Sequence, residues 1–222
     1  MEPIKRQPVF YLTHGGGPCF WTRFPEPYGP QAYEPLKSYF AGLLARLPEQ
    51  PRAVVVISAH WEEPVTTVST AIAPPMLYDY YGFPSHTYEL QYPARGLPEV
   101  GLRVRDLLRA AGIEANTDED RGFDHGVFVP MLVIDPQARI PVVMVSMRGD
   151  LDSAHHLAVG QAVAPLREEG VLIVGSAIGP IVASDGNGDG PTRPLEGPTF
   201  RMSPRRVCVR QLCPERLRVF GA

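Results

Sequence analysis

The sequence predicts a single layered α/β domain, with a largely parallel or mixed central sheet flanked by helices. Short apolar, β-branched runs alternate with longer segments that repeat apolar residues at helical spacing, which is typical of α/β proteins. The clearest runs are residues 53–58 (AVVVIS), 141–147 (PVVMVSM) and 171–174 (VLIV). Because these runs carry almost no polar residue, we expect buried parallel strands there.

The first elements are defined by apolar patterns and by the residues that end them. Residues 8–13 (PVFYLT) are followed by His14 and three glycines, which predicts a strand that enters a tight loop. Residues 31–47 place aromatic and leucine side chains at helical spacing, and Pro48 follows them, so an amphipathic helix is expected. A further strand is expected over 65–70.

The later elements continue the alternation of helix and strand. Apolar residues at helical spacing over 100–111, followed by Gly112 in the position of a C-terminal cap, predict a second helix. A third helix is expected over 152–166, where alanine, leucine and valine share one stripe. The aromatic segment 76–93 and the polar segment 117–126 are expected to be loops.

Composition is that of an ordinary globular domain and excludes several classes of partner. The chain has 222 residues, of which 44% are hydrophobic and 20% charged, and its formal net charge is -3. The lack of a basic excess argues against a nucleic acid or an anionic membrane as partner. No apolar run is long enough to span a bilayer, and the N-terminal segment lacks the apolar core of a secretory signal. The three cysteines fit a reducing cytosol, so a cytoplasmic protein is expected.

Two histidines stand where ligands bind in such folds. His14 and His60 each follow a predicted strand, and open α/β sheets bind ligands beyond the carboxyl ends of their strands. Two neutral imidazoles at that edge can share one divalent metal such as Zn(II) or Fe(II). Spacing alone favours the alternative that each is a loop or core histidine satisfied by hydrogen bonds, because no HExxH-type pattern is present. The glycine-rich loop matches no nucleotide-binding pattern either.

A third histidine, His125, lies in the polar loop before an apolar segment. Asp124 or a backbone carbonyl can hold one of its ring nitrogens and leave the other for a substrate or a proton. Capping of the following helix is an equal alternative. Cys19 has no base beside it and is expected to be an inert buried thiol. The aromatic run 78–83 either lines a substrate pocket or packs over the core. Surface or capping positions are expected for the remaining histidines, His86, His155 and His156.

Five ordered segments of the chain resemble the extradiol ring-cleaving dioxygenases of the LigB superfamily, specifically their DOPA-dioxygenase-like branch. The segments are residues 11–18 (YLTHGGGP), 56–62 (VISAHWE), 78–84 (YDYYGFP), 124–130 (DHGVFVP) and 170–176 (GVLIVGS). Several motifs in order make a more specific match than any single motif. The resemblance therefore raises a metal role for the first two histidines above the alternative.

The resemblance implies a single-domain enzyme with one non-haem Fe(II) or Zn(II) per chain, held in part by His14 and His60. His125 would lie in the pocket, where it positions the substrate or moves a proton. The implied substrates are O2 and a small catechol, DOPA or a related catecholic acid, whose ring is opened beside the diol. A metal serves this chemistry by lowering the pKa of the catechol and by bringing both reactants together.

The sequence departs from the family pattern after Ser176. The histidine that the family uses as a base or an extra ligand falls on Ile181, and no histidine after His156 is present to serve as a further ligand. Residues 177–222 also contain seven Arg, four acidic residues and no Lys, a change of composition that coincides with the departure. We therefore predict a family-matching catalytic domain at 1–176 and a divergent, frame-shifted or truncated tail of the same domain at 177–222.

The departure from the family pattern affects the catalytic activity expected of this chain. With two ligands assigned and the base missing, ring-cleaving turnover of this chain is expected to be impaired. The alternative is a non-catalytic metal-binding or interaction protein on the same fold, because fold alone does not determine a reaction.

Overall fold

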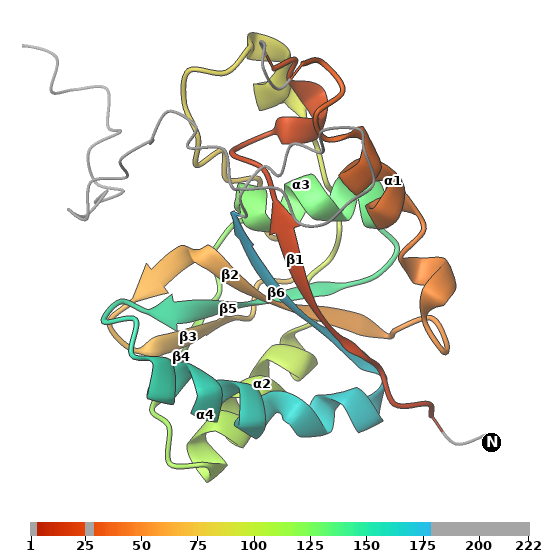
Figure 1. The fold of residues 1–222 in the computed structure, drawn as a ribbon. Helices are drawn as coiled ribbons and strands as arrows, with labels where there is room; N and C mark the ends of the chain where they lie inside the picture. The colour runs from red at the N-terminus through yellow and green to blue at the C-terminus, as the bar shows by residue number, and fades with distance from the viewer. Residues whose placement is uncertain (1–3, 25–28, 179–222) are drawn as a thin grey trace, which may run out of the picture.

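One six-stranded sheet forms the centre of the molecule (Figure 1). The computed structural model describes residues 4–24 and 29–178. The strands are β1 (Val9–His14), β2 (Ala53–Glu63), β3 (Thr66–Ser69), β4 (Ala115–Asp118), β5 (Val142–Arg148) and β6 (Val171–Ile178), in the sheet order β1-β6-β2-β5-β3-β4. All neighbours pair in parallel except β3 and β5, which are antiparallel. The predicted α/β fold with a largely parallel or mixed sheet is confirmed.

The α-helices of the described residues cover the two faces of the sheet. One face carries α1 (Glu34–Ala41) and α3 (His125–Ile134), and the opposite face carries α2 (Pro98–Ala110) and α4 (Ser153–Val163) (Figure 1). The second predicted helix ends as expected, because Gly112 follows α2 with a φ of 77°, a left-handed conformation that glycine adopts without strain.

Side chains of the central strands alternate between these two faces. In β2, Val54 and Val56 belong to the core beneath α1 and α3, whereas Val55 belongs to the core beneath α2 and α4. Leu172 and Ile173 of β6 divide in the same way. Burying each such side chain fully contributes about 1.5–3 kcal/mol. Burial on both faces explains why these strands are uninterrupted apolar runs in the sequence.

Near the site one element differs from the prediction, and a second takes a form that the sequence analysis did not assign. β2 extends beyond Ser58 to Glu63, because its pairing with β5 resumes after a register shift between Ser58 and Glu62. His60 therefore lies within an irregular part of a strand rather than after its end. The apolar segment behind the polar loop is the helix α3, although Pro130 lies inside it. Proline removes the hydrogen bond to the Gly126 carbonyl, and the Ser176 hydroxyl of β6 donates to that carbonyl instead (2.5 Å).

Two further differences lie away from the site. The helix expected over 31–47 is shorter, because α1 ends at Ala41 and Gly42 leaves the helical conformation. The segment expected to be a loop over 117–126 begins inside β4, which pairs with β3. Neither difference moves a candidate site residue.

The predicted divergent tail at 177–222 lies outside the described residues, except that residues 177–178 complete β6. Ile181, at the position of the missing base, also lies outside them. Within the described part of the chain, no helix has both the length and the apolar character needed to cross a bilayer.

Candidate metal centre

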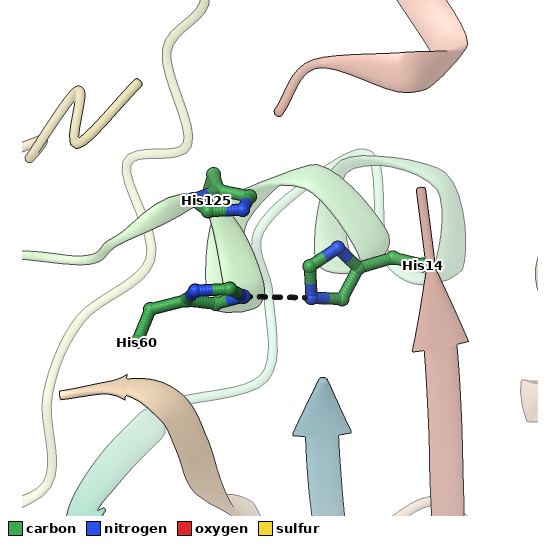
Figure 2. A group of neighbouring side chains, drawn as sticks. All are labelled: His14, His60 and His125. Carbon is green, nitrogen blue, oxygen red and sulfur yellow. Dashed lines mark hydrogen bonds between the residues drawn. The ribbon is translucent and has the colours of Figure 1, made fainter. Parts of the chain in front are cut away.

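Three histidines from three separate elements meet above the carboxyl edge of the sheet (Figure 2). His14 is the last residue of β1, His60 lies in the irregular part of β2, and His125 is the first residue of α3. One ring nitrogen from each lies within 4.8 Å of the others. The structure therefore brings together all three histidines that the sequence predicts for the site.

The rings form a compact cluster. The Nε2 atoms of His14 and His60 are 3.3 Å apart. The ring of His125 lies over that of His60, with centroids 3.9 Å apart and planes inclined by 37°, and stands edge-on to His14 (Figure 2). His14 and His125 are buried, whereas His60 is half-buried.

Hydrogen bonds determine which ring nitrogens carry a proton. His14 Nδ1 lies 2.8 Å from the Gly15 carbonyl, which only accepts, so Nδ1 donates and Nε2 presents a lone pair. His125 Nδ1 lies 2.8 Å from a carboxylate oxygen of Asp79 and donates in the same way. Its Nε2 is buried and has no hydrogen-bond partner among the described residues. Two of the three rings therefore direct unprotonated nitrogens into the cluster.

The surroundings keep His14 and His60 neutral. Burial lowers the pKa of His14 to about 4. Burial, together with the neighbouring His125 and His14, lowers the pKa of His60 to about 3. Burial alone would raise the pKa of Asp79, but its hydrogen bond to His125 and that ring's charge lower it below the ordinary value. At neutral pH the site thus combines neutral His14 and His60 with an ionised Asp79, and neutral imidazoles are the form that binds a metal.

These residues fit a divalent first-row metal. Neutral imidazole nitrogens are ligands for Zn(II) and Fe(II), and ligating histidines usually donate their other ring N–H to a carbonyl or a carboxylate. His14 and His125 make such bonds, to Gly15 and Asp79. The buried Nε2 of His125 has no hydrogen-bond partner among the described residues, so its lone pair is available to such a group.

A buried ion pair supports the cluster from below. Asp124 is fully buried and accepts hydrogen bonds from the Ser58 hydroxyl (2.9 Å) and from Arg121 Nη2 (3.0 Å). Burial and the nearby Asp79 raise the pKa of Asp124, while Arg121 opposes the shift. Arg121 also donates to the backbone carbonyl of His60 (3.4 Å). The pair therefore connects the start of α3 to the irregular part of β2.

The prediction that Asp124 or a backbone carbonyl holds the imidazole of His125 is wrong. Asp124 does not hold the imidazole, because its backbone is extended (φ −75°, ψ 171°) and its carboxylate reaches Ser58 of β2 instead. Asp79 takes this place from 46 residues away in the sequence. Sequence reasoning missed Asp79, since its only signal is an acidic residue inside an otherwise aromatic run.

The aromatic run packs over the core, which is one of the two expectations, and it also lies beside the histidine cluster. Tyr78 and Tyr80 pack against Phe128 of α3, and the ring of Tyr80 stands edge-on to His125 at 6.1 Å. Tyr81 points outward and is 84% exposed. The inner members of the run thus cover the core and border the histidine cluster.

The other candidate residues lie outside the cluster, and Cys19 and His86 lie as the sequence predicts, whereas His155 and His156 are half-buried and Asp152 caps their helix. Cys19 is buried, and burial raises the pKa of its thiol to about 12, which makes it inert. His86 is an exposed residue bonded to the Trp21 carbonyl. His155 and His156 lie in the first turn of α4 and do not join the cluster.

Comparison with known proteins agrees with this geometry. Residues 22–177 match the family described as the catalytic LigB subunit of aromatic ring-opening dioxygenase. The chain belongs to the LigB family. The resemblance in the sequence is thereby confirmed, and the match includes His60 and His125. Enzymes of the LigB family depend on a non-haem metal, which is the kind of group that the three-histidine cluster fits.

Several LigB relatives have been named. The chain is 42% identical over 180 residues to dioxygenase tasH of Hapsidospora irregularis, covering 76% of this chain and 52% of the relative. It is 46% identical over 129 residues to a 4,5-DOPA dioxygenase extradiol of Beta vulgaris, covering 58% and 48%. The corresponding protein of Escherichia coli is 38% identical over 128 residues, covering 57% and 46%. The chain thus spans about half the length of the curated relatives it matches.

A solved structure shares the LigB fold. The crystal structure of an uncharacterized protein from Escherichia coli K12 superimposes with a TM-score of 0.58 at 30% identity, covering 83% of this chain and 66% of that one.

Proposed function

We propose that this chain is an extradiol dioxygenase, which opens the ring of a small catechol with O2 at a non-haem metal held by His14 and His60. The observation that carries the proposal is the convergence of three imidazoles at the carboxyl edge of the sheet, one of them with a buried, unpartnered Nε2. Membership of the LigB family supports it, and relatives that bear the name 4,5-DOPA dioxygenase extradiol favour a DOPA-like catechol.

His14 and His60 would hold Fe(II) or Zn(II), one ion per chain, through the Nε2 atoms that lie 3.3 Å apart. When bound, such a metal supplies Lewis acidity toward a catechol and a position for O2 beside it. In the metal-free protein His14 Nε2 is unprotonated, so the short contact requires a proton on His60 Nε2. A metal bound at this atom requires the other neutral tautomer of His60, in which the proton moves from Nε2 to Nδ1.

His125 would lie on the substrate side of the cluster. Its unpartnered Nε2 is a proton acceptor within the cluster, and the ring of Tyr80 stands edge-on to the imidazole. The residue can therefore orient a catechol hydroxyl or accept its proton. Because the family's other histidine falls on Ile181, we expect turnover of this chain to be impaired.

The test is an anaerobic titration of the purified protein with Fe(II) and with Zn(II), beside the variants His14→Ala and His60→Ala. We expect one-to-one binding that both variants lose. His86→Ala, which removes an exposed histidine outside the cluster, is the matched control and should bind as tightly as the unmodified protein. Absence of binding, or equal binding by all variants, would contradict the proposed metal site.

Oxygen uptake by the Fe(II)-loaded protein then tests the reaction itself. We expect slow uptake with L-DOPA and with simple catechol that depends on both metal-binding histidines. A protein that binds metal and consumes no oxygen with any catechol would instead support a non-catalytic metal-binding protein on the LigB fold, as the missing histidine at Ile181 allows.

A further inference from the structure

Asp79 holds His125 through two separate contacts. One carboxylate oxygen accepts from the backbone N–H of His125 (2.9 Å), and the other oxygen lies 2.8 Å from its Nδ1. A contact to the backbone alone would suffice to anchor the start of α3. The second contact fixes the ring, so the carboxylate determines both where residue 125 lies and how its imidazole is turned.

The segment that carries Asp79 is itself held firmly against the chain before α3. Phe123 donates its N–H to the Pro75 carbonyl (2.8 Å), and Leu77 donates its N–H to the Phe123 carbonyl (2.9 Å). The two neighbours of Asp79 are tied down as well. The hydroxyl of Tyr78 donates to the Leu90 carbonyl and that of Tyr80 to the Thr87 carbonyl, each at 2.6 Å. The carboxylate is therefore presented to His125 by a well-anchored backbone.

This arrangement selects one tautomer of the imidazole. An ionised carboxylate only accepts hydrogen bonds, so Nδ1 of His125 carries a proton, and in the neutral ring Nε2 is then bare. That bare nitrogen is buried, has no partner among the described residues, and belongs to the cluster with His14 and His60. The opposite tautomer would place an N–H there and could not accept a proton.

We propose that Asp79 is a positioning residue for the LigB-type reaction, because it holds His125 in the Nδ1–H tautomer with Nε2 ready to accept a catechol proton. The inference rests on the proposed function. In the proton transfer the catechol O–H bond breaks and an Nε2–H bond forms, which leaves a catecholate and an imidazolium. The proton on Nδ1 stays where it is, and the Asp79 carboxylate stabilises the positive ring.

The first readout needs neither metal nor substrate. In metal-free protein labelled with ¹⁵N-histidine, NMR distinguishes the protonated from the bare ring nitrogen, and His125→Gln identifies the signals of His125. We expect the unmodified protein to carry the proton on Nδ1. In Asp79→Asn the amide oxygen can still accept from the backbone N–H while its NH2 faces Nδ1, so the proton should move to Nε2.

The second readout is binding of 4-nitrocatechol, whose visible absorption reports its ionisation, to the Zn(II)-loaded protein. We expect Asp79→Asn to weaken this binding by roughly tenfold to a hundredfold, the size of effect seen on activity when the carboxylate behind a metal-binding histidine is lost. Zn(II) should still bind one-to-one. Asp135→Asn is the matched control, because this buried carboxylate accepts from the Ile140 N–H (2.8 Å) outside the cluster.

The outcomes separate this inference from the proposed function. If Zn(II) binding depends on His14 and His60 but Asp79→Asn keeps both the Nδ1–H tautomer and the 4-nitrocatechol affinity, the inference is wrong and the metal site stands. If the unmodified protein binds no Zn(II), the proposed function fails. Should Asp79→Asn not fold, the unmodified protein still decides, because an Nε2–H tautomer of its His125 would overturn the assignment.

Discussion

The chain contains two groups of neighbouring histidines, and they differ in what their ring nitrogens do. At the start of α4, His155 bonds to the Thr66 hydroxyl and to Arg148, while His156 bonds to the Arg148 N–H and to the Asp152 carbonyl, so all four ring nitrogens have partners. In the cluster of His14, His60 and His125, one buried nitrogen has no partner. An unsatisfied nitrogen, rather than the proximity of histidines, distinguishes a binding site from a structural network.

The largest expected difference between the two regions concerns their Asp–Arg pairs. Asp124→Ala should destabilise the protein by about 3–5 kcal/mol, because it leaves the mostly buried Arg121 without its counterion. The matched variant Asp150→Ala removes a carboxylate that pairs with Arg148 beside the other histidine group, in solvent, and should leave the urea midpoint nearly unchanged. Urea unfolding followed by circular dichroism measures both, and equal midpoints for the two variants would contradict the comparison.

The next largest expected effect is a loss of folding stability as the pH falls. Because burial holds the folded-state pKa of His14 near 4, below its ordinary value of 6.5, the folded protein binds this proton more weakly than the unfolded chain does. The stabilisation is complete above pH 6.5 and is lost as the pH falls toward 4, which amounts to about 2 kcal/mol at pH 5. Urea unfolding of the metal-free protein at pH 7 and pH 5 should show this loss.

The pH dependence can be assigned with two variants. His14→Gln removes one of two titrating rings and should make the decline between pH 7 and pH 5 shallower, while His60, whose pKa is also lowered by burial, keeps the rest of it. His86→Gln alters only the exposed histidine and should keep the full decline. A decline that is equally steep in both variants would mean that the His14 ring does not cause it.

Alanine substitutions at two glycines, one in α3 beside the cluster and one in α4, compare how tightly the two regions are packed. A Cβ on Gly126 would lie 2.7 Å from His60 Cδ2 and 2.9 Å from the Ser58 hydroxyl oxygen, so Gly126→Ala should cost about 1–3 kcal/mol and displace the His60 ring. A Cβ on Gly160 of α4 would meet no atom within 4 Å, and Gly160→Ala should stabilise the helix by about 0.5–1 kcal/mol. Thermal melts and Zn(II) titrations check the pair. Unchanged Zn(II) affinity in Gly126→Ala would show that α3 does not press against the metal site.

The sequence predicts those parts of the site that depend on patterns within one segment. It misses those that depend on contacts between residues far apart in the chain. The apolar runs identify β1 and β2, and the rule that parallel strands end on one edge brings His14 and His60 together without knowledge of the structure. His125 joins them because α3 begins at the same edge. The bond from Asp79 to His125 has no such local signal, since the sequence separates them by 46 residues and offers the adjacent Asp124 as a nearer candidate.

Sequence patterns also do not predict the irregular parts of strands and helices. The run 53–58 predicts a strand, but the continuation of β2 to Glu63 depends on a register shift against β5 that no periodicity records. The helix α3 contains Pro130, which favours a loop in a sequence-based prediction, and it is tolerated because Ser176 of another strand satisfies the carbonyl that proline leaves free. The division of the chain at 176 stays a prediction, because the described residues end at 178.

The smallest expected effect on stability comes from removing one hydrogen-bond partner of His155, which belongs to the histidine pair whose ring nitrogens are all bonded. Because Arg148 donates to His155 Nδ1, the other nitrogen of that ring carries its proton and donates to the Thr66 hydroxyl (2.8 Å). Thr66→Val keeps the shape of the side chain and should cost about 1 kcal/mol. Zn(II) binding should stay one-to-one, since the lost contact frees a protonated nitrogen and no lone pair. A second equivalent of Zn(II) bound by this variant, in a titration beside the unmodified protein, would show that satisfied partners alone keep His155 and His156 from binding metal.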